Sequence, residues 1–147
     1  MNQEREKDMS FKVRARSIAG TYAEGEALVS KMALGFNHGV YTDTGIIKDN
    51  GHDLQGVSMK GKVFVFPNGR GSTGASYYFY QLIKAGGGPV AMIMDKADTI
   101  VAAGAIMSDV PTVDALEDGA YHTIETGDYV KVDAANGTVE IIKRGER

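Results

Sequence analysis

A glycine-rich turn, residues 69–74, holds the side chains of this chain whose types and spacing best suit chemistry. Its sequence, Gly-Arg-Gly-Ser-Thr-Gly, places the guanidinium of Arg70 and the hydroxyl of Ser72 among unobstructed backbone amides. An apolar segment, Lys62–Phe66, precedes the turn, and a helix-like segment, Ala75–Ala85, follows it. In a strand–turn–helix unit, backbone N–H groups and the positive end of the helix dipole point toward the same place. The turn is therefore predicted to bind an anionic group.

One interpretation of the turn is a dinucleotide site. Gly69, Gly71 and Gly74 match G-x-G-x-x-G, and Asp95 follows about 20 residues later, where the ribose-binding acid of such a site stands. Against it, Pro67-Asn68 separates the strand from the first glycine, and only one βαβ unit is visible. A Rossmann domain needs more alternating strands and helices than this chain offers.

A second interpretation is a serine hydrolase. A nucleophile elbow has the pattern G-x-S-x-G, which would need glycine at position 70, where the chain has Arg70. His38, His52 and His122 are the candidate bases, but their spacing does not favour any of them.

The third interpretation makes Ser72 a proton acceptor in a lyase that acts on an anionic substrate. A serine hydroxyl is a weak base and must pass through an alkoxide, which backbone amides and a nearby guanidinium would stabilise. Arg70 could supply that charge, or it could bind a carboxylate or phosphate through two parallel hydrogen bonds. A purely structural turn, with Ser72 as the N-cap of the following helix, is the alternative without chemistry.

The composition narrows the choice of partners. The net charge of −3 and the pI near 5.6 argue against a nucleic-acid-binding surface. The chain has no cysteine, so it can offer neither a disulfide nor a thiolate ligand to a metal or iron–sulfur cluster. It contains no apolar run of ~18 residues and no signal-like N-terminus, which favours a cytoplasmic protein that does not enter a membrane.

The pattern of apolar residues predicts a mixed α+β domain with more strands than helices. Residues 1–9 are expected to form a flexible tail, residues 10–143 the domain, and residues 144–147 a basic tail. Residues 35–61 are rich in Gly, Asp, Asn and Thr and are expected to form long loops around a short strand at Ile46-Ile47. The helices are expected at Ala75–Ala85 and Asp98–Ala105, and the other strands at Phe11–Arg16, Glu24–Val29, Lys62–Phe66, Val90–Met94, Pro111–Val113, Asp128–Asp133 and Thr138–Ile142.

From the glycine-rich turn outward, the sequence resembles the small subunit of the aconitase X family, whose swivelling domain carries a G-R-G-S turn. The resemblance extends over residues 10–142 in order, which makes it far more specific than the turn alone. The matching stretches include Thr44–Ile46, His52–Leu54, Gly61–Val63, Arg70–Thr73, Ser76-Tyr77, Tyr80–Leu82, Ile100–Ala102, Gly104–Ile106, Pro111–Asp114 and Thr126–Asp133.

The resemblance implies a swivelling β/β/α domain related to aconitase domain 4, with a mixed sheet or barrel-like strands. It also implies a large-subunit partner whose cysteines hold an iron–sulfur cluster, so that this chain binds no cofactor itself. In the family the serine after G-R-G is the proton acceptor, and this role carries over to Ser72. The cluster iron would act as the Lewis acid on the leaving hydroxyl group of a small anionic hydroxy acid.

The implied reaction is a dehydration, in which (R)-5-phosphomevalonate becomes trans-anhydromevalonate 5-phosphate. Another branch of the family dehydrates cis-3-hydroxy-L-proline, and this branch stays open because residues 35–42 depart from the family's Ser-aromatic-Gly-Gly-Val-Asp-Pro run. A non-catalytic interaction domain is the alternative of another class. The predicted site residues are Ser72 as proton acceptor and, for substrate binding, Gly69, Arg70, Gly71, Thr73, Ser76, His38 and His52, with no metal ligand.

For His38, drift of an exposed loop is the competing explanation. For His52, a structural role in bonding a loop backbone competes with a role in binding or catalysis. Ser76 lies one helical turn beyond Ser72 and could line the same cleft or bond back into its own helix.

Overall fold

The computed structural model describes residues 9–70 and 74–144. Within these ranges no helix has the length and apolar character needed to cross a membrane. In chain order the elements are β1 (Ser10–Arg14), β2 (Arg16–Ala19), β3 (Tyr22–Val29), β4 (Val63–Phe66), α2 (Ala75–Lys84), β5 (Ala91–Met94), α3 (Thr99–Ser108), β6 (Thr112–Asp114), the 3₁₀ segment η1 (Glu117–Thr123), β7 (Tyr129–Asp133) and β8 (Thr138–Ile142).

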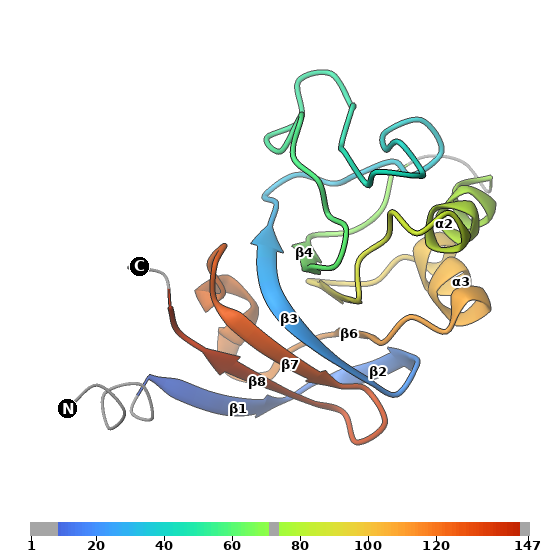
Figure 1. The fold of residues 1–147 in the computed structure, drawn as a ribbon. Helices are drawn as coiled ribbons and strands as arrows, with labels where there is room; N and C mark the ends of the chain where they lie inside the picture. Colours follow the sequence, from blue (N-terminus) through green and yellow to red (C-terminus); the bar gives the residue numbers. More distant parts are fainter. Residues whose placement is uncertain (1–8, 71–73, 145–147) are drawn as a thin grey trace.

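The eight strands of the described residues form one mixed sheet in the order β1-β8-β7-β3-β4-β5-β6-β2. The strands from β1 to β3 in this order pair antiparallel, the strands from β3 to β6 pair parallel, and β2 returns antiparallel at the edge. The long strand β3 belongs to both parts, because its residues 22–26 pair with β7 and its residues 27–29 with β4. An antiparallel layer and a parallel layer therefore meet along β3, with α2 and α3 on the far side of the parallel strands (Figure 1).

The two central strands, β4 and β5, are buried at every position because both of their faces are covered. Phe64 and Phe66 of β4 belong to the core beneath α2 and α3, whereas Val63 and Val65 belong to the core shared with the antiparallel layer. The alternation follows the two-residue period of a strand. It gives the β/β/α layering that the resemblance implied, and the expected α+β class is confirmed.

The mixed sheet is open and does not close into a barrel, since its edge strands β1 and β2 do not pair with each other. They are nevertheless consecutive in the chain. The segment expected as one strand, Phe11–Arg16, is divided at Ala15, where the chain leaves β8 and crosses to β6. The alternation of Phe11, Val13 and Ala15 predicted extended backbone, but it carried no signal for this change of partner.

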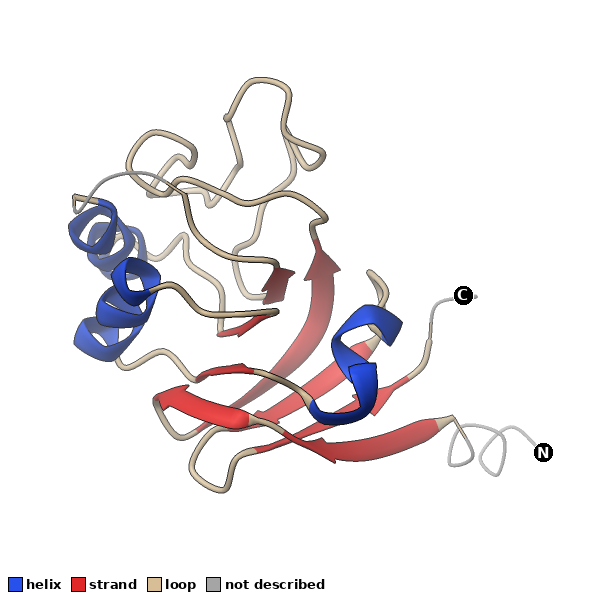
Figure 2. Ribbon diagram, turned by 180° about the vertical axis from the view of Figure 1, so that it is seen from behind, coloured by secondary structure: helices blue, strands red, loops and turns tan. Residues whose placement is uncertain are grey.

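A long loop, residues 30–62, lies over the carboxyl ends of β3 and β4 (Figures 1 and 2). Within it Ile46 and Ile47 make isolated bridges with Ser58 and Val40 instead of the expected short strand. Leu34, Phe36, Ile47 and Met59 anchor the loop because their side chains are buried in the core beneath the helices. The loop is thus a packed part of the domain at the edge where the glycine-rich turn begins.

Candidate active site

The glycine-rich turn follows β4 and is held by Asp98, the residue that begins α3. One carboxylate oxygen of Asp98 accepts a hydrogen bond from the Gly69 amide at 2.7 Å, and the other accepts one from the Val101 amide at 3.0 Å. The second bond is a helix N-cap. A β-carbon at position 69 would overlap the Val101 side chain and lie about 3.0 Å from the Asp98 carboxylate, so the close approach requires glycine.

The turn is also attached to the long loop through backbone hydrogen bonds. The Leu34 amide donates to the Asn68 carbonyl at 3.3 Å, and the Arg70 amide donates to the Leu34 carbonyl at 3.0 Å. A β-carbon at Gly35 would lie 2.9 Å from the Arg70 carbonyl oxygen, so the loop and the turn approach each other as closely as glycine allows. The start of the turn is therefore fixed from both sides, by α3 and by the loop.

Gly71, Ser72 and Thr73 lie outside the described residues, so their predicted roles stay predictions. The chain is described again from Gly74, which occupies the N-cap position of α2 and makes no side-chain cap bond. The helix end next to Ser72 thus has Gly74 at the position that the purely structural interpretation gave to Ser72.

The Arg70 side chain is more than half exposed and forms an ion pair with Asp49 of the long loop, with 2.5 Å between Nη2 and Oδ2. A guanidinium has five N–H donors, and this bond engages one of them. Arg70 can therefore bind a carboxylate or phosphate while Asp49 keeps it in place. No sequence motif indicated Asp49, because the pairing depends on how the loop folds over the turn.

The two predicted histidines lie in different surroundings. His38 is exposed, and its ring centroid lies 6.0 Å from that of Tyr78 on α2. His52 is buried, and its Nδ1 accepts a hydrogen bond from the Leu54 amide at 3.0 Å, while its Nε2 lies 3.4 Å from Ser30 Oγ. The contacts of His52 are those expected of a histidine that shapes a loop, and a role in substrate binding stays a prediction for both.

Ser76 is half-buried in the first turn of α2, where its backbone oxygen lies close to Gly104 of α3. Ser76 is thus the second residue of the helix, and its expected position one turn beyond Ser72 stays a prediction because Ser72 lies outside the described residues. The role of Ser76 in substrate binding stays a prediction.

Two hollows open at this edge of the molecule. The smaller, of about 150 Å³, lies at the glycine-rich turn itself and is lined by Gly69, Arg70, Ala75, Asp98, Ile100 and Val101. The larger, of about 370 Å³, lies where β3, β4 and β5 end, and its lining residues are Val29, Ser30, Lys31, Pro67, Asp95, Tyr121, His122 and Ile124. The carboxyl ends of parallel strands are the usual place for ligands in such sheets.

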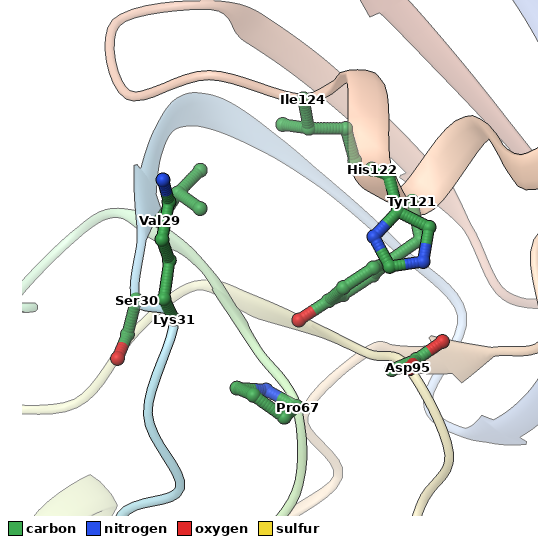
Figure 3. Close-up of a pocket in the computed structure, with 8 residues that line it drawn as sticks. All are labelled: Val29, Ser30, Lys31, Pro67, Asp95, Tyr121, His122 and Ile124. Atoms are coloured by element: carbon green, nitrogen blue, oxygen red, sulfur yellow. The ribbon is translucent and has the colours of Figure 1, made fainter.

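Figure 3 shows the larger cavity between the end of β3 and the 3₁₀ segment η1. Lys31 and Val29 form one side, Tyr121 and His122 the other, and the Tyr121 hydroxyl points into the space between them. Burial and, to a smaller extent, the negative charge of Asp95 raise the pKa of Tyr121 to about 12, so its hydroxyl stays protonated and can donate. The sequence singled out Asp95 as a ribose ligand but gave no signal that Tyr121 of η1 would line the same cavity.

The buried carboxylate of Asp114 helps to hold this edge of the sheet in place. Asp114, at the end of β6, accepts two hydrogen bonds from the Arg16 guanidinium, at 2.8 and 2.7 Å, and a third from the Ala97 amide at 2.7 Å. Burial alone would raise the pKa of Asp114, but the bonds from Arg16 and Ala97 outweigh it and lower the pKa. Because Ala97 precedes Asp98, this carboxylate helps to fix the residue that holds the turn.

The described residues bring together no group of three His, Asp or Glu side chains that could hold a metal ion. With no cysteine in the sequence, the donor set of this chain does not fit an iron–sulfur cluster. Any such cluster would have to be bound by another polypeptide.

Comparison with known proteins assigns the class. Residues 12–141 match the family model described as the aconitase X swivel domain. The chain also superposes on a crystal structure of Thermococcus kodakaraensis aconitase X in its holo-form, with a TM-score of 0.85 and 46% identity over 90% of this chain and 99% of that one. The chain therefore belongs to the aconitase X swivel-domain family.

Its relatives carry a more particular name. Proteins named phosphomevalonate dehydratase small subunit are similar to it in Methanosarcina acetivorans, at 46% identity over 90% of this chain and 92% of the relative, and in Thermococcus kodakarensis, at 47% over 92% and 100%. The resemblance predicted from the sequence is thus confirmed. The names describe dehydratase small subunits, which implies that the relatives have a large-subunit partner.

Proposed function

We propose that this chain is the small subunit of a dehydratase that converts (R)-5-phosphomevalonate to trans-anhydromevalonate 5-phosphate. The observation that carries the proposal is the match to relatives of that name, at close to half identity and nearly full length on both sides. The position of the glycine-rich turn, at the carboxyl end of β4 and the start of α2, supports it. This is an edge of the sheet where an anionic substrate can meet a second subunit.

In the proposed reaction Ser72 removes the proton from the carbon next to the one that bears the hydroxyl group. Ser72 acts as the alkoxide and becomes the neutral alcohol. The C–H electron pair becomes the new C=C bond, the C–O electron pair leaves with the hydroxyl oxygen, and this oxygen takes up a proton from solvent and departs as water. Ser72 returns its proton to solvent before the next turnover. The substrate anion would be oriented by Arg70, because its bond to Asp49 engages one of the five N–H donors of a guanidinium. Correct placement of the reacting atoms contributes as much to such a rate as the base itself.

The partner in this proposal is a large subunit that holds the iron–sulfur cluster. What supports a cluster-binding partner is the chemistry of this chain. It has no cysteine to supply a thiolate, and its described residues bring together no three carboxylate or imidazole ligands. The isolated chain should accordingly be inactive.

The test is co-expression of this chain with a cysteine-bearing large subunit of the same family, followed by an assay for the alkene product. (R)-5-phosphomevalonate and cis-3-hydroxy-L-proline should be compared as substrates, because residues 35–42 depart from the family pattern. The proposal expects product from the first and none from the second. Turnover of hydroxyproline alone would assign the chain to the other branch, and assembly without any dehydration would favour a non-catalytic interaction domain.

A further inference from the structure

The cavity of about 370 Å³ between β3 and η1 has no assigned role, although it lies on the same edge as the glycine-rich turn. Its volume falls within the range of ~300–1,000 Å³ that is typical of small-molecule sites. Its walls combine apolar side chains, among them Val29, Pro67 and Ile124, with four groups that can bind polar atoms: Lys31, Tyr121, His122 and Asp95. A cavity with this lining suits a polar group of a small ligand better than an apolar group.

Lys31 provides the positive charge of the cavity. Among the described residues its ammonium takes part in no ion pair, and only its backbone amide is engaged, with the Asp53 carboxylate. The neighbouring Ser30 hydroxyl is turned away from the cavity and donates to Asp53 instead (Figure 3). The polar chemistry on this side of the cavity therefore comes from Lys31.

Tyr121 provides a neutral donor on the opposite side. Its hydroxyl points into the cavity, and the raised pKa keeps it protonated at any physiological pH. The ring of His122 lies beside that of Tyr121, with 5.1 Å between the centroids. An anionic group placed between Lys31 and the Tyr121 hydroxyl would thus meet an ammonium on one side and an O–H donor on the other.

Lys31 and Arg70 both lie at the edge of the sheet where its parallel strands end. They belong to two segments of the chain that are hydrogen-bonded to each other. The Ser30 amide donates to the Val65 carbonyl at 2.8 Å, and the Arg70 amide donates to the Leu34 carbonyl at 3.0 Å, so residues 30–34 run beside residues 65–70. Leu34 is the third residue after Lys31, and extended chain advances at most ~3.6 Å per residue. The backbone at Lys31 therefore lies within about 11 Å of the backbone at Leu34, which is hydrogen-bonded to Arg70, so the segments that carry the two cations border the same edge of the sheet.

We propose that this cavity binds the phosphate group of the substrate, with the Lys31 ammonium as its counter-ion and the Tyr121 hydroxyl as a second donor. Arg70 then receives the carboxylate at the other end of the molecule. This inference rests on the function proposed above, which supplies a substrate with two anionic groups. Asp95 lies beside Tyr121, away from Lys31, where it repels an anion and so limits the affinity (Figure 3).

The experiment measures steady-state kinetics of the assembled complex with (R)-5-phosphomevalonate. Lys31→Met should raise KM about tenfold with kcat within about twofold, because a charge-assisted bond to the substrate is lost while the reacting atoms are untouched. Tyr121→Phe should raise KM by a smaller factor, and Asp95→Asn should lower it. Lys12→Met, an exposed lysine on β1 in the antiparallel layer, is the matched control and should leave KM unchanged.

Inorganic phosphate gives a second readout as a competitive inhibitor, since Lys31→Met should raise its inhibition constant and Lys12→Met should not. A KM for Lys31→Met within twofold of the control would overturn the phosphate site, as would a higher KM for Asp95→Asn, which would indicate a cationic ligand group. Either result would leave the proposed function standing. Failure of the wild-type complex to dehydrate (R)-5-phosphomevalonate would instead overturn the function itself.

Discussion

Asp98 connects the glycine-rich turn to helix α3, so its replacement tests how the fold supports the site. Its two oxygens hold the Gly69 amide, at the start of the turn, and the Val101 amide, in the first turn of α3. Asp98→Ala removes both acceptors at once. The turn and the helix should then separate, because no other side chain of the described residues accepts from either amide.

The size of the effect follows from the two bonds. Loss of an N-cap acceptor costs about 1 kcal/mol. A hydrogen bond to a charged acceptor contributes about 1.5–3 kcal/mol, and the half-buried position of Asp98 favours the lower end. We therefore expect Asp98→Ala to lower the free energy of unfolding by roughly 2–3 kcal/mol, and Asp98→Asn, which keeps one acceptor, by about half of that.

The assay is denaturant unfolding of the full chain, followed by kinetics of the assembled complex. Asp43→Ala, at an exposed loop position, is the control for removal of an acidic side chain. Asp98→Ala should also lower kcat, since the turn that carries Ser72 loses one of its two supports. Unfolding free energies for Asp98→Ala and Asp43→Ala that agree within error would refute this account of the turn.

Three further predictions concern the packing around the site. Asp114→Asn should destabilise the fold at pH 7, and the gap from wild type should shrink as the pH falls below about 4. The sign follows from the lowered pKa of Asp114, whose carboxylate stabilises the fold above the unfolded-state pKa and loses its effect as it is protonated; urea unfolding at several pH values tests this, and a constant gap would contradict it. Gly104→Ala should destabilise by about 1–3 kcal/mol in thermal unfolding, because the new methyl group would lie 3.2 Å from both the Phe79 β-carbon and the Ser76 carbonyl, and an unchanged melting temperature would show that α2 and α3 can separate freely. Gly69→Ala should reduce activity of the complex more than Gly25→Ala, since a β-carbon would overlap Val101 of α3 at the first position and would come no closer than 3.4 Å to any atom at the second; equal losses would argue against close packing of the turn.

Most of the fold could be predicted from local sequence patterns. The buried strands β4 and β5, the hairpin β7–β8 and the helix α2 follow from apolar runs, Asn136-Gly137 and the periodicity of residues 75–85. Such elements are specified by near neighbours in the chain. The helix expected from Asp98 was predicted for the same reason, and the structure shows that Asp98 is the N-cap of α3.

What could not be predicted depends on contacts between distant residues. The division of β1 from β2 at Ala15 is decided by which strand edge is available on each side. The 3₁₀ segment η1 contains two residues with positive φ, Asp118 and Gly119, and has no regular periodicity to detect. The pairing of Asp49 with Arg70 and the covering of the larger cavity by Tyr121 depend on segments that are far apart in sequence.

The same distinction holds for the site. The glycine-rich turn could be located from its residue types, because glycines, an arginine and a serine between a strand and a helix have few structural explanations. The groups that hold the turn, Asp98 and Leu34, could not, since an acidic residue and a buried leucine are ordinary in any sequence. The supporting residues only become visible once the sheet brings the ends of its parallel strands together.

The most direct test of the central claim is the turnover number of the assembled complex that carries Ser72→Ala, with Ser17→Ala on β2 as the control. If Ser72 accepts the substrate proton, kcat should fall by ~10²–10⁴ while KM and subunit assembly are retained. Wild-type turnover by the Ser72→Ala complex would contradict the account.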